Sequence, residues 1–358
     1  MWSSHHSAFG LDISDLSIKL AWLKKTGRQF RLASFSRQEI PEGAIEEGEI
    51  KKEEELIEII KKTITDVKGE KVKTKYCVVS LPETEAFIRV IQLPKINEDE
   101  IGEAIKWELE SNFPVTLEEV YFDWQVIKNS FSPESLNILI GALPKKLVDP
   151  YLSVIKKAGL RPVVFEIESI ATARALIKED KPEGPLMIID FGAKRSSFII
   201  FASGAIWLTT SLPIANNLLV ADIARMLKID AAKAKKLKIE FGLNLFEEGG
   251  KIFQAMEPRL MELAQEIRKY LEYYQTNLLP KLPQKAPINK ILLCGGGASL
   301  EGLSGFLSSE LKMEVTIGNP WINIFDPSSA PKKLPGLPFS ESLSYTTALG
   351  LALRGAKQ

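Results

Sequence analysis

The sequence predicts an α/β protein built from two duplicated halves, and two observations carry this expectation. Apolar runs typical of strands alternate with amphipathic helical segments along most of the 358 residues. A strand–turn–strand unit also occurs twice, as "LDISDLSIKL" from residue 11 and "IDFGAKRSSFII" from residue 189. Each copy has an aspartate, Asp12 or Asp190, where its first strand ends. Because a chain of this length is too long for one compact core, we expect two lobes.

Composition indicates a globular protein of the cytoplasm. Hydrophobic residues make up 45% of the chain, and 46 basic residues balance 46 acidic ones, which argues against a dominant nucleic-acid surface but not against a local basic patch. No apolar run reaches the roughly 18 residues of a membrane span, and the start "MWSSHHS" lacks the pattern of a signal peptide. Cys77 and Cys294 stand in apolar, strand-like runs, so we predict two buried free thiols.

The first lobe is expected from residues 8–84 and 166–184. Residues 8–35 read as two or three strands, and the apolar spacing of residues 51–67 is that of a helix. The run "KYCVVSLP" predicts a strand that is covered on both faces. A short helix, "SIATARALIKED", follows residue 168, and the segment 181–185 reads as a hinge because proline and glycine punctuate it.

Residues 85–165 read as a subdomain inserted into the first lobe. The order is strand, helix, two strands, helix, strand, which is large enough to hold a core of its own. Asn97 and Glu100 form a capping box at the start of the first helix. A turn is expected at 132–133, and Gly159 ends the second helix.

The second lobe repeats the first hairpin and then adds helices. We expect its main part at 185–225 and 286–358, and a smaller subdomain at 226–285. Helices are predicted at about 216–240 and about 256–278. A strand, a glycine turn and a helix follow in "NKILLCGGGASLEGLSGFLSSEL", and "YTTALGLALRG" is a closing helix.

The two hairpins and the glycine turn have the chemistry of a nucleotide site. Polar turns expose backbone N–H groups that can hold phosphate oxygens. Facing carboxylates of Asp12 and Asp190 can hold Mg²⁺ through its waters, and Lys19 can reach the same phosphates. Gly295–Gly297 let a flat ligand approach the backbone, and the helix beginning near Ser299 directs its N-terminus at it. Each of these features alone is common in proteins that bind no nucleotide. Their order and spacing together favour a nucleotide site.

In this order the motifs resemble the actin-like ATPase superfamily, which includes actin, the DnaK chaperones and FtsA. "LDISDLSIK" is similar to its first phosphate loop, "IDFGAKRSS" to its second and "LLCGGGASLEG" to its adenosine loop. The resemblance implies a duplicated, ribonuclease H-like fold of two lobes that binds ATP and Mg²⁺ between them.

Three further segments resemble the PilM family within this superfamily. They are "EIKKEEELIEIIKKTI", "IKWELESNFPVTLEEVYFDWQVI" and "YTTALGLALRG". Residues 85–165 match the position and pattern of the 1C subdomain that is inserted in FtsA and PilM. In that family the protein is a cytoplasmic ATP-binding adaptor of type IV pilus assembly.

The resemblance also implies the residues of the site. Those expected to contact the nucleotide are Asp12, Ser14, Ser17, Lys19, Asp190, Gly192, Ala193, Lys236, Gly295, Gly296, Gly297 and Ser299. Asp12 and Asp190 would hold the metal. Glu168 is the candidate to orient an attacking water, with slow hydrolysis at most; a helix-start carboxylate stabilised by the helix dipole is the alternative interpretation.

Three positions depart from the family pattern. Ser14 stands where the first loop usually has glycine, and Ala215–Asn216 replace a usual pair of glycines. Lys233 stands where an acidic residue normally precedes the adenine-side lysine. A Cβ at a phosphate contact takes up room, and a lysine removes an acceptor for the ribose or adenine. A nucleotide-free scaffold is therefore the alternative.

The partner implied by the resemblance is the short N-terminal cytoplasmic tail of a PilN-like inner-membrane protein. The chain would lie at the inner membrane through this partner, within the pilus complex, with self-association also open. We expect the tail to bind a strand edge of the inserted subdomain, which is rich in aromatic residues: Phe87, Trp107, Phe113, Tyr121, Phe122 and Trp124.

Two other functions remain as alternatives. A small-molecule kinase of the same superfamily would need a substrate pocket with its own base, and no further motif supports one. An FtsA-like division scaffold usually ends in an amphipathic membrane helix, whereas this sequence ends in "LALRGAKQ" after its closing helix.

Overall fold

The computed structural model describes residues 7–27, 29–112, 116–127, 135–179, 184–246, 250–282, 285–325 and 336–357. The first six residues, Phe113, the expected turn at 132–133 and positions 181–183 of the expected hinge lie outside the described residues.

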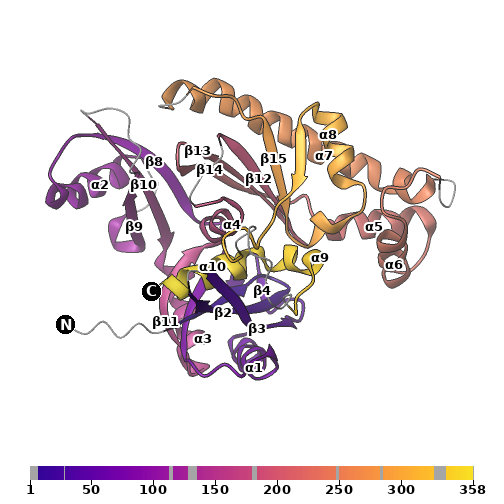
Figure 1. Cartoon of the computed structure of the whole chain (residues 1–358), viewed down its shortest axis with the longest axis horizontal. Helices are drawn as coiled ribbons and strands as arrows, with labels where there is room; N and C mark the ends of the chain where they lie inside the picture. Colours follow the sequence, from indigo (N-terminus) through magenta and orange to yellow (C-terminus); the bar gives the residue numbers. More distant parts are fainter. Residues whose placement is uncertain are drawn as a thin grey trace.

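The first lobe is built on a six-stranded mixed sheet (Figure 1). Its strands in spatial order are β11 (Arg161–Ile167), β7 (Tyr76–Leu81), β1 (Phe9–Ile13), β2 (Ser17–Thr26), β3 (Gln29–Glu39) and β6 (Lys68–Gly69). β1 runs antiparallel to β2 and parallel to β7. Helices α1 (Glu53–Thr65) and α3 (Lys145–Lys157) share one core with one face of the sheet. Helices α4 (Glu168–Leu176) and α10 (Thr346–Lys357) cover the other. A small hairpin of β4 (Ile45–Glu46) and β5 (Glu49–Ile50) precedes α1.

The second lobe repeats this pattern. Its sheet has the order β14 (Ala205–Leu212), β13 (Ser196–Ala202), β12 (Leu186–Phe191), β15 (Lys290–Cys294) and β16 (Glu314–Ile317). β12 is antiparallel to β13 and parallel to β15, as β1 is to β2 and β7. Asp12 lies opposite Lys19 in the first hairpin and Asp190 lies opposite Ser197 in the second, so the two aspartates hold equivalent positions. The duplication predicted from the sequence is confirmed.

Helices gather on the outer face of the second sheet. They are α5 (Asn216–Leu227), α6 (Ala231–Phe241), α7 (Lys251–Tyr273) and α8 (Leu303–Leu311). The long helix expected at about 256–278 begins earlier, at Lys251, and ends as a π-helical turn, Tyr274–Leu278. Short helical turns and α9 (Phe339–Ser342) complete the chain before α10. Among the residues described above, no helix is both long and apolar enough to cross a lipid bilayer.

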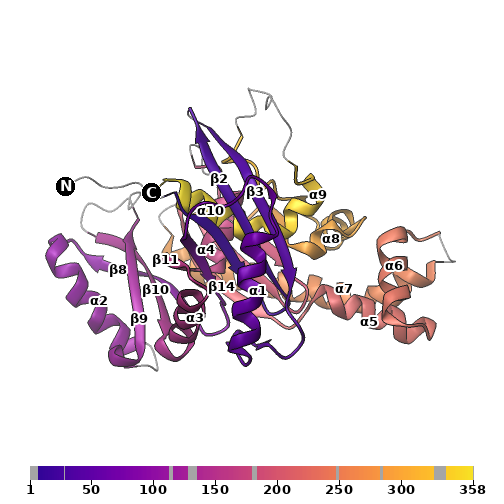
Figure 2. The ribbon, with the colours of Figure 1, turned by 90° about the horizontal axis from the view of Figure 1, so that it is seen from below.

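The insertion forms a three-stranded antiparallel sheet with one helix. Its strands are β8 (Phe87–Pro94), β10 (Ser135–Pro144) and β9 (Val120–Val126), in that spatial order, with α2 (Glu98–Asn112) against them. Glu100 accepts a hydrogen bond from the Asn97 N–H at 3.1 Å, as the capping box predicts. Within the expected range 85–165, α3 and β11 pack in the first lobe. The insertion and the α5–α6 pair lie at opposite ends of the molecule (Figure 1, Figure 2).

Both cysteines are free and buried, as expected. Cys77 lies in β7 and Cys294 ends β15. Burial raises the pKa of Cys77 to about 12, so its thiol is uncharged and unreactive at neutral pH.

Small residues let α10 approach its neighbours closely. A Cβ on Gly350 would lie 1.9 Å from the carbonyl oxygen of Ala171 in α4. A Cβ on Gly10 in β1 would lie 2.4 Å from the carbonyl oxygen of Ala348. Since both obstacles are backbone atoms, neither can move aside without moving an element.

Gly350→Ala should therefore destabilise the fold by roughly 3 kcal/mol, because α10 and α4 must separate to admit the methyl group. Urea unfolding measures the change. Gly305→Ala is the matched control: Gly305 lies in α8, where an added Cβ has open space, so helix propensity should raise stability by up to about 1 kcal/mol. Equal effects of the two substitutions would contradict the close-packing explanation.

Candidate functional site

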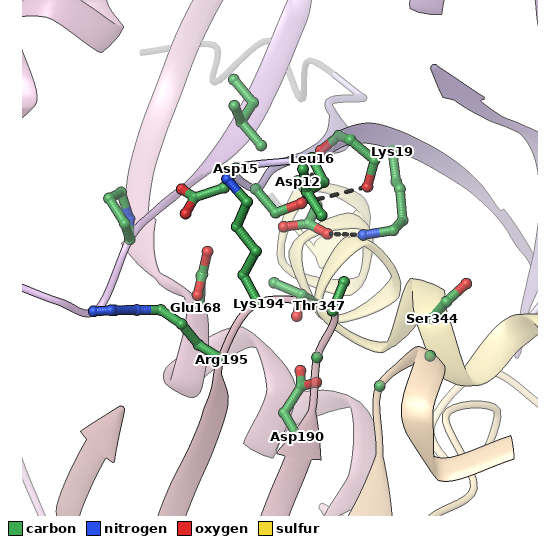
Figure 3. Close-up of a pocket in the computed structure, with 18 of the residues that line it drawn as sticks. Asp12, Asp15, Leu16, Lys19, Glu168, Asp190, Lys194, Arg195, Ser344 and Thr347 are labelled. Carbon is green, nitrogen blue, oxygen red and sulfur yellow. Dashed lines mark hydrogen bonds and ion pairs between the residues drawn. The ribbon is translucent and has the colours of Figure 1, made fainter. Parts of the chain in front are cut away.

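A cavity of about 410 Å³ lies where the two lobes meet (Figure 3). The ends of β1 and β12, the turns that follow them, the glycine turn after β15 and the start of α4 form its walls. The predicted site residues that line it are Asp12, Ser14, Ser17, Lys19, Glu168, Asp190, Gly192, Ala193, Gly295 and Gly296. Residues from three distant parts of the chain thus meet at one place.

Three predicted residues lie outside the cavity wall. Lys236 is exposed on α6, and its neighbour Lys235 lines the cavity in its place. Gly297 is buried behind the wall, where a Cβ would lie 2.5 Å from the Phe191 ring. Ser299 is exposed and donates a hydrogen bond to the Gly296 carbonyl at 2.8 Å, which closes the turn.

Asp12 is held in place by two partners. Lys19, directly opposite on β2, donates from Nζ to Oδ2 at 3.0 Å, and the pair is buried. Ser80 at the end of β7 donates to Oδ1 at 3.2 Å and accepts from the Ile13 N–H at 2.9 Å. The carboxylate is therefore fixed in orientation before any ligand arrives.

Asp190 is tightly enclosed by the glycine turn. Gly295 has φ +81°, and a Cβ there would lie 2.2 Å from Asp190 Oδ1. Only glycine fits both the backbone conformation and the space. Burial, with the nearby Asp12 charge, raises the pKa of Asp190 to about 6, and the positive charge of Lys19 offsets part of this rise. Figure 3 shows the Asp12 and Asp190 side chains on opposite walls of the cavity.

The two hairpin turns present free backbone N–H groups. Among the described residues, no hydrogen-bond partner is found for the N–H groups of Asp15 and Leu16 in the first turn, or of Ala193 and Lys194 in the second. The Gly192 and Ala193 carbonyls accept from the first N–H groups of α5, at 3.0 and 3.1 Å. The C=O and N–H of one trans peptide point in opposite directions. Because the two carbonyls point at α5, the N–H groups of Ala193 and Lys194 in the same peptides point away from it. Such donors suit phosphate oxygens.

Two further carboxyl groups line the cavity, and burial raises the pKa of both. Glu83, in the loop between β7 and β8, is only 6% exposed, and no described residue bonds its oxygens with good geometry. Burial raises its pKa to about 7, with a contribution from the Asp190 charge, while the hydroxyls of Thr209 and Ser169 lower it. Burial also raises the pKa of Glu168 well above its usual value, assisted by the negative charges of Asp12 and Glu83.

The sequence analysis missed several residues of the cavity. Lys194 extends from the second turn toward Asp15 of the first (Figure 3). Arg195 lies beside it, and its buried Nε has no partner among the described residues. The other missed residues include Arg37, Glu83, Lys235, Ser344 and Thr347. The "AKR" within the second turn was the available signal for the first two, since cations beside a phosphate loop suggest an anion.

The structure accounts for the three departures from the family pattern, and the two that replace glycine need no glycine conformation. Ser14 and Ala215 both have negative φ. The Ser14 hydroxyl donates to the Ser17 carbonyl at 3.0 Å, so it is used within the turn. Asn216 accepts from buried Lys238 at 2.5 Å, and burial lowers the pKa of that lysine to about 8. Lys233 is exposed and lies outside the cavity wall.

Comparison with known proteins gives one family match over nearly the whole chain. Residues 10–356 match the family described as type IV pilus assembly protein PilM. Among solved structures, the PilM–PilN type IV pilus biogenesis complex is similar with a TM-score of 0.79 and 25% identity, covering 99% of this chain and 100% of that one.

More distant matches agree on the fold. MreB5 of Spiroplasma citri bound to ADP has a TM-score of 0.52 at 14% identity, covering 88% of this chain and 92% of that one. The cell division protein FtsA of Escherichia coli K12 is 22% identical over 222 residues, which are 56% of this chain and 50% of FtsA. The chain thus spans about half the length of the curated relatives it matches. The fold is actin-like, as predicted.

The proton on Glu83 should make stability depend on pH. Its pKa is higher in the folded chain, about 7, than the ordinary value of 4.5, so folding favours the protonated form. This contribution is complete below about pH 4.5 and is lost as the pH rises through about 7. Between about pH 5 and about pH 8, wild type should lose roughly 2 to 3 kcal/mol relative to Glu83→Gln.

Urea unfolding at both pH values tests this. The exposed α1 residue Glu54 supplies the control, and Glu54→Gln should leave the pH profile unchanged. A Glu83→Gln profile parallel to that of wild type would contradict the assignment of the proton to this side chain.

Proposed function

The chain belongs to the family of type IV pilus assembly protein PilM, and from this membership we propose that it is an ATP-binding adaptor of the pilus machine. Its partner is the cytoplasmic tail of a PilN-like inner-membrane protein, which holds the chain at the cytoplasmic face of that membrane. The observation that carries the nucleotide half of this proposal is the pairing of Asp12 and Asp190, on equivalent strands of two duplicated lobes, across one cavity.

The cavity residues fit a magnesium nucleotide. Asp12 and Asp190 supply hard oxygen ligands on opposite walls, which suits Mg²⁺ that keeps most of its waters. The free N–H groups of the two turns, with Lys194 and Arg195, suit the phosphates. Gly295 and Gly296 line the cavity without side chains, which leaves room for the flat part of the ligand. The ADP held by the MreB5 neighbour supports the same class of ligand.

Turnover by this site should be slow. Glu168 is our candidate to orient a water, but burial and the surrounding negative charges raise its pKa well above the usual value. Only the ionised form of a carboxyl group can act as a base, and a raised pKa disfavours that form. ATP then acts chiefly as a ligand that holds the two lobes together, which suits an adaptor.

Asp190→Asn should weaken ATP binding at least about ten-fold when Mg²⁺ is present, because it removes a ligand charge without changing size. Isothermal calorimetry with Mg²⁺–ATP measures the affinity, and the same titration in EDTA is the control. In EDTA the variant should bind ATP at least as tightly as wild type, because no metal ligand is lost and a negative charge facing the phosphates is removed. Binding of no ATP by the wild type in either buffer would support the nucleotide-free scaffold instead.

The edge of the inserted sheet suits an extended tail. β9 is the outer strand beside β10, so one side of its backbone has no neighbouring strand among the described residues. Tyr121 and Trp124 on β9 are 48% and 40% exposed. Tyr121 donates to Asp149 of α3 at 3.1 Å, so the face of β9 that carries Tyr121 is turned toward α3. A peptide paired with β9 would direct alternate side chains to the two faces of the sheet, where one would meet Tyr121 and another would meet Trp124. Phe87 and Phe122 pack against the core of the insertion instead.

Tyr121→Ala should weaken binding of a synthetic peptide of the PilN-like tail by about 30-fold, the effect typical of an aromatic anchor. Fluorescence anisotropy of a labelled peptide measures it. Trp107→Ala is the matched control, because Trp107 belongs to the same subdomain and is 71% exposed but lies on α2. If only the Trp107 variant lost peptide binding, the proposed site on β9 would be contradicted and α2 would be the binding element.

A further inference from the structure

A second hollow lies on the first lobe, at the opposite ends of its parallel strands from the nucleotide cavity. It has a volume of about 580 Å³ and is open to solvent. Ser7, Trp22, Lys73, Thr74, Lys75, Tyr76 and Arg161 line it. Three of these seven residues are cations, and none is acidic.

The three cations of the hollow are exposed and uncompensated. Among the described residues, Lys73, Lys75 and Arg161 take part in no ion pair. The nearby acidic residue, Glu70, is already engaged by Lys24 at 2.5 Å and by Arg31 at 2.6 Å. The hollow therefore keeps a local positive charge in a chain whose charges balance overall.

The strands fix the positions of these cations. Arg161 is the first residue of β11 and lies opposite Tyr76, the first residue of β7. The Arg161 N–H donates to the Lys75 carbonyl at 2.8 Å, which holds the two cationic segments side by side. Trp22 forms a buried wall, with its Nε1 donating to Ser7 Oγ at 3.0 Å and Lys24 Nζ 4.4 Å from its ring. The three cations thus lie at the amino ends of hydrogen-bonded strands, which hold them in place.

The direction of the strands separates the two sites. β1, β7 and β11 run parallel, so their carboxyl ends lie at the nucleotide cavity and their amino ends at the hollow. The six residues of β7 correspond to about 20 Å. A flat surface could therefore cover the hollow and leave the cavity open.

We propose that this basic hollow docks on the anionic phosphate headgroups of a lipid bilayer. Lysine supplies two of the three cations, and its compact charge suits headgroup phosphates that present no fixed planar geometry. The cations form one cluster, whereas a nucleic-acid site needs charges that extend along a backbone. The proposal rests on the proposed function only in placing the chain beside a membrane.

The test is co-sedimentation of the full chain with vesicles, without nucleotide or partner. The chain should bind vesicles of equal parts phosphatidylglycerol and phosphatidylcholine. It should not bind these vesicles in high salt, and it should not bind vesicles of phosphatidylcholine alone. Lys73→Glu/Lys75→Glu should weaken binding by at least about 25-fold, since each near-surface lysine contributes roughly five-fold. Lys281→Glu/Lys285→Glu is the matched control: it makes the same change in net charge on exposed residues of the second lobe and should keep binding.

Three results would overturn the proposal. They are no binding to anionic vesicles, equal binding by the hollow variant and wild type, and hollow-dependent binding of a DNA duplex with none to vesicles. A failure here leaves the proposed function intact, because neither ATP nor the partner's tail takes part. Loss of ATP or tail binding, in turn, leaves vesicle binding unaffected.

Discussion

The close contact between α4 and α10 is the constraint on which the rest of the structure depends. Gly350 meets the backbone of Ala171 with no room for a methyl group, which presses α4 onto the first lobe. The other side of α4 packs in the core of the second sheet through Ala173 and Leu176. One nine-residue helix is thus shared by both lobes, and its first residue, Glu168, lines the cavity between them. A displaced α4 would change the distance between the two aspartates.

The sequence predicted what depends on local pattern and on duplication. The hairpins, Asp12 and Asp190, the glycine turn and the buried cysteines follow from apolar runs and their order. Glu83 could not be found this way, because its burial depends on the second lobe, whose Thr209 and Asp190 lie far away in the chain. Which of Lys235 and Lys236 lines the cavity depends on the rotation of α6 about its axis. Successive residues of a helix are about 100° apart around that axis, so the sequence alone does not decide.

Charge in the cavity is arranged for a ligand that is itself an anion. Asp12 is neutralised by Lys19, and Asp190, Glu83 and Glu168 have raised pKa values. The cations of the second turn have no comparable partners among the described residues. Without a ligand, burying charged groups in the cavity costs free energy. The carboxyl groups can lower this cost by taking up protons, whereas Lys194 and Arg195 keep their charge. Phosphates that bind these cations would also favour the proton on Glu168, so in the proposed function ATP binding and slow hydrolysis would have the same physical origin.

The proposed tail site and the proposed nucleotide cavity are joined through α3. Tyr121 on the edge strand β9 bonds to Asp149 of α3, and Tyr151 of the same helix donates to the Gly48 carbonyl at 2.9 Å. The Gly48 N–H in turn donates to the carboxylate of Asp15, in the first phosphate turn, at 3.2 Å. A Cβ on Gly48 would lie 2.7 Å from Pro82, so this residue is wedged against the loop that carries Glu83. A tail that moves α3 must therefore strain or break contacts at the first turn, and a ligand that fixes this turn must resist that movement.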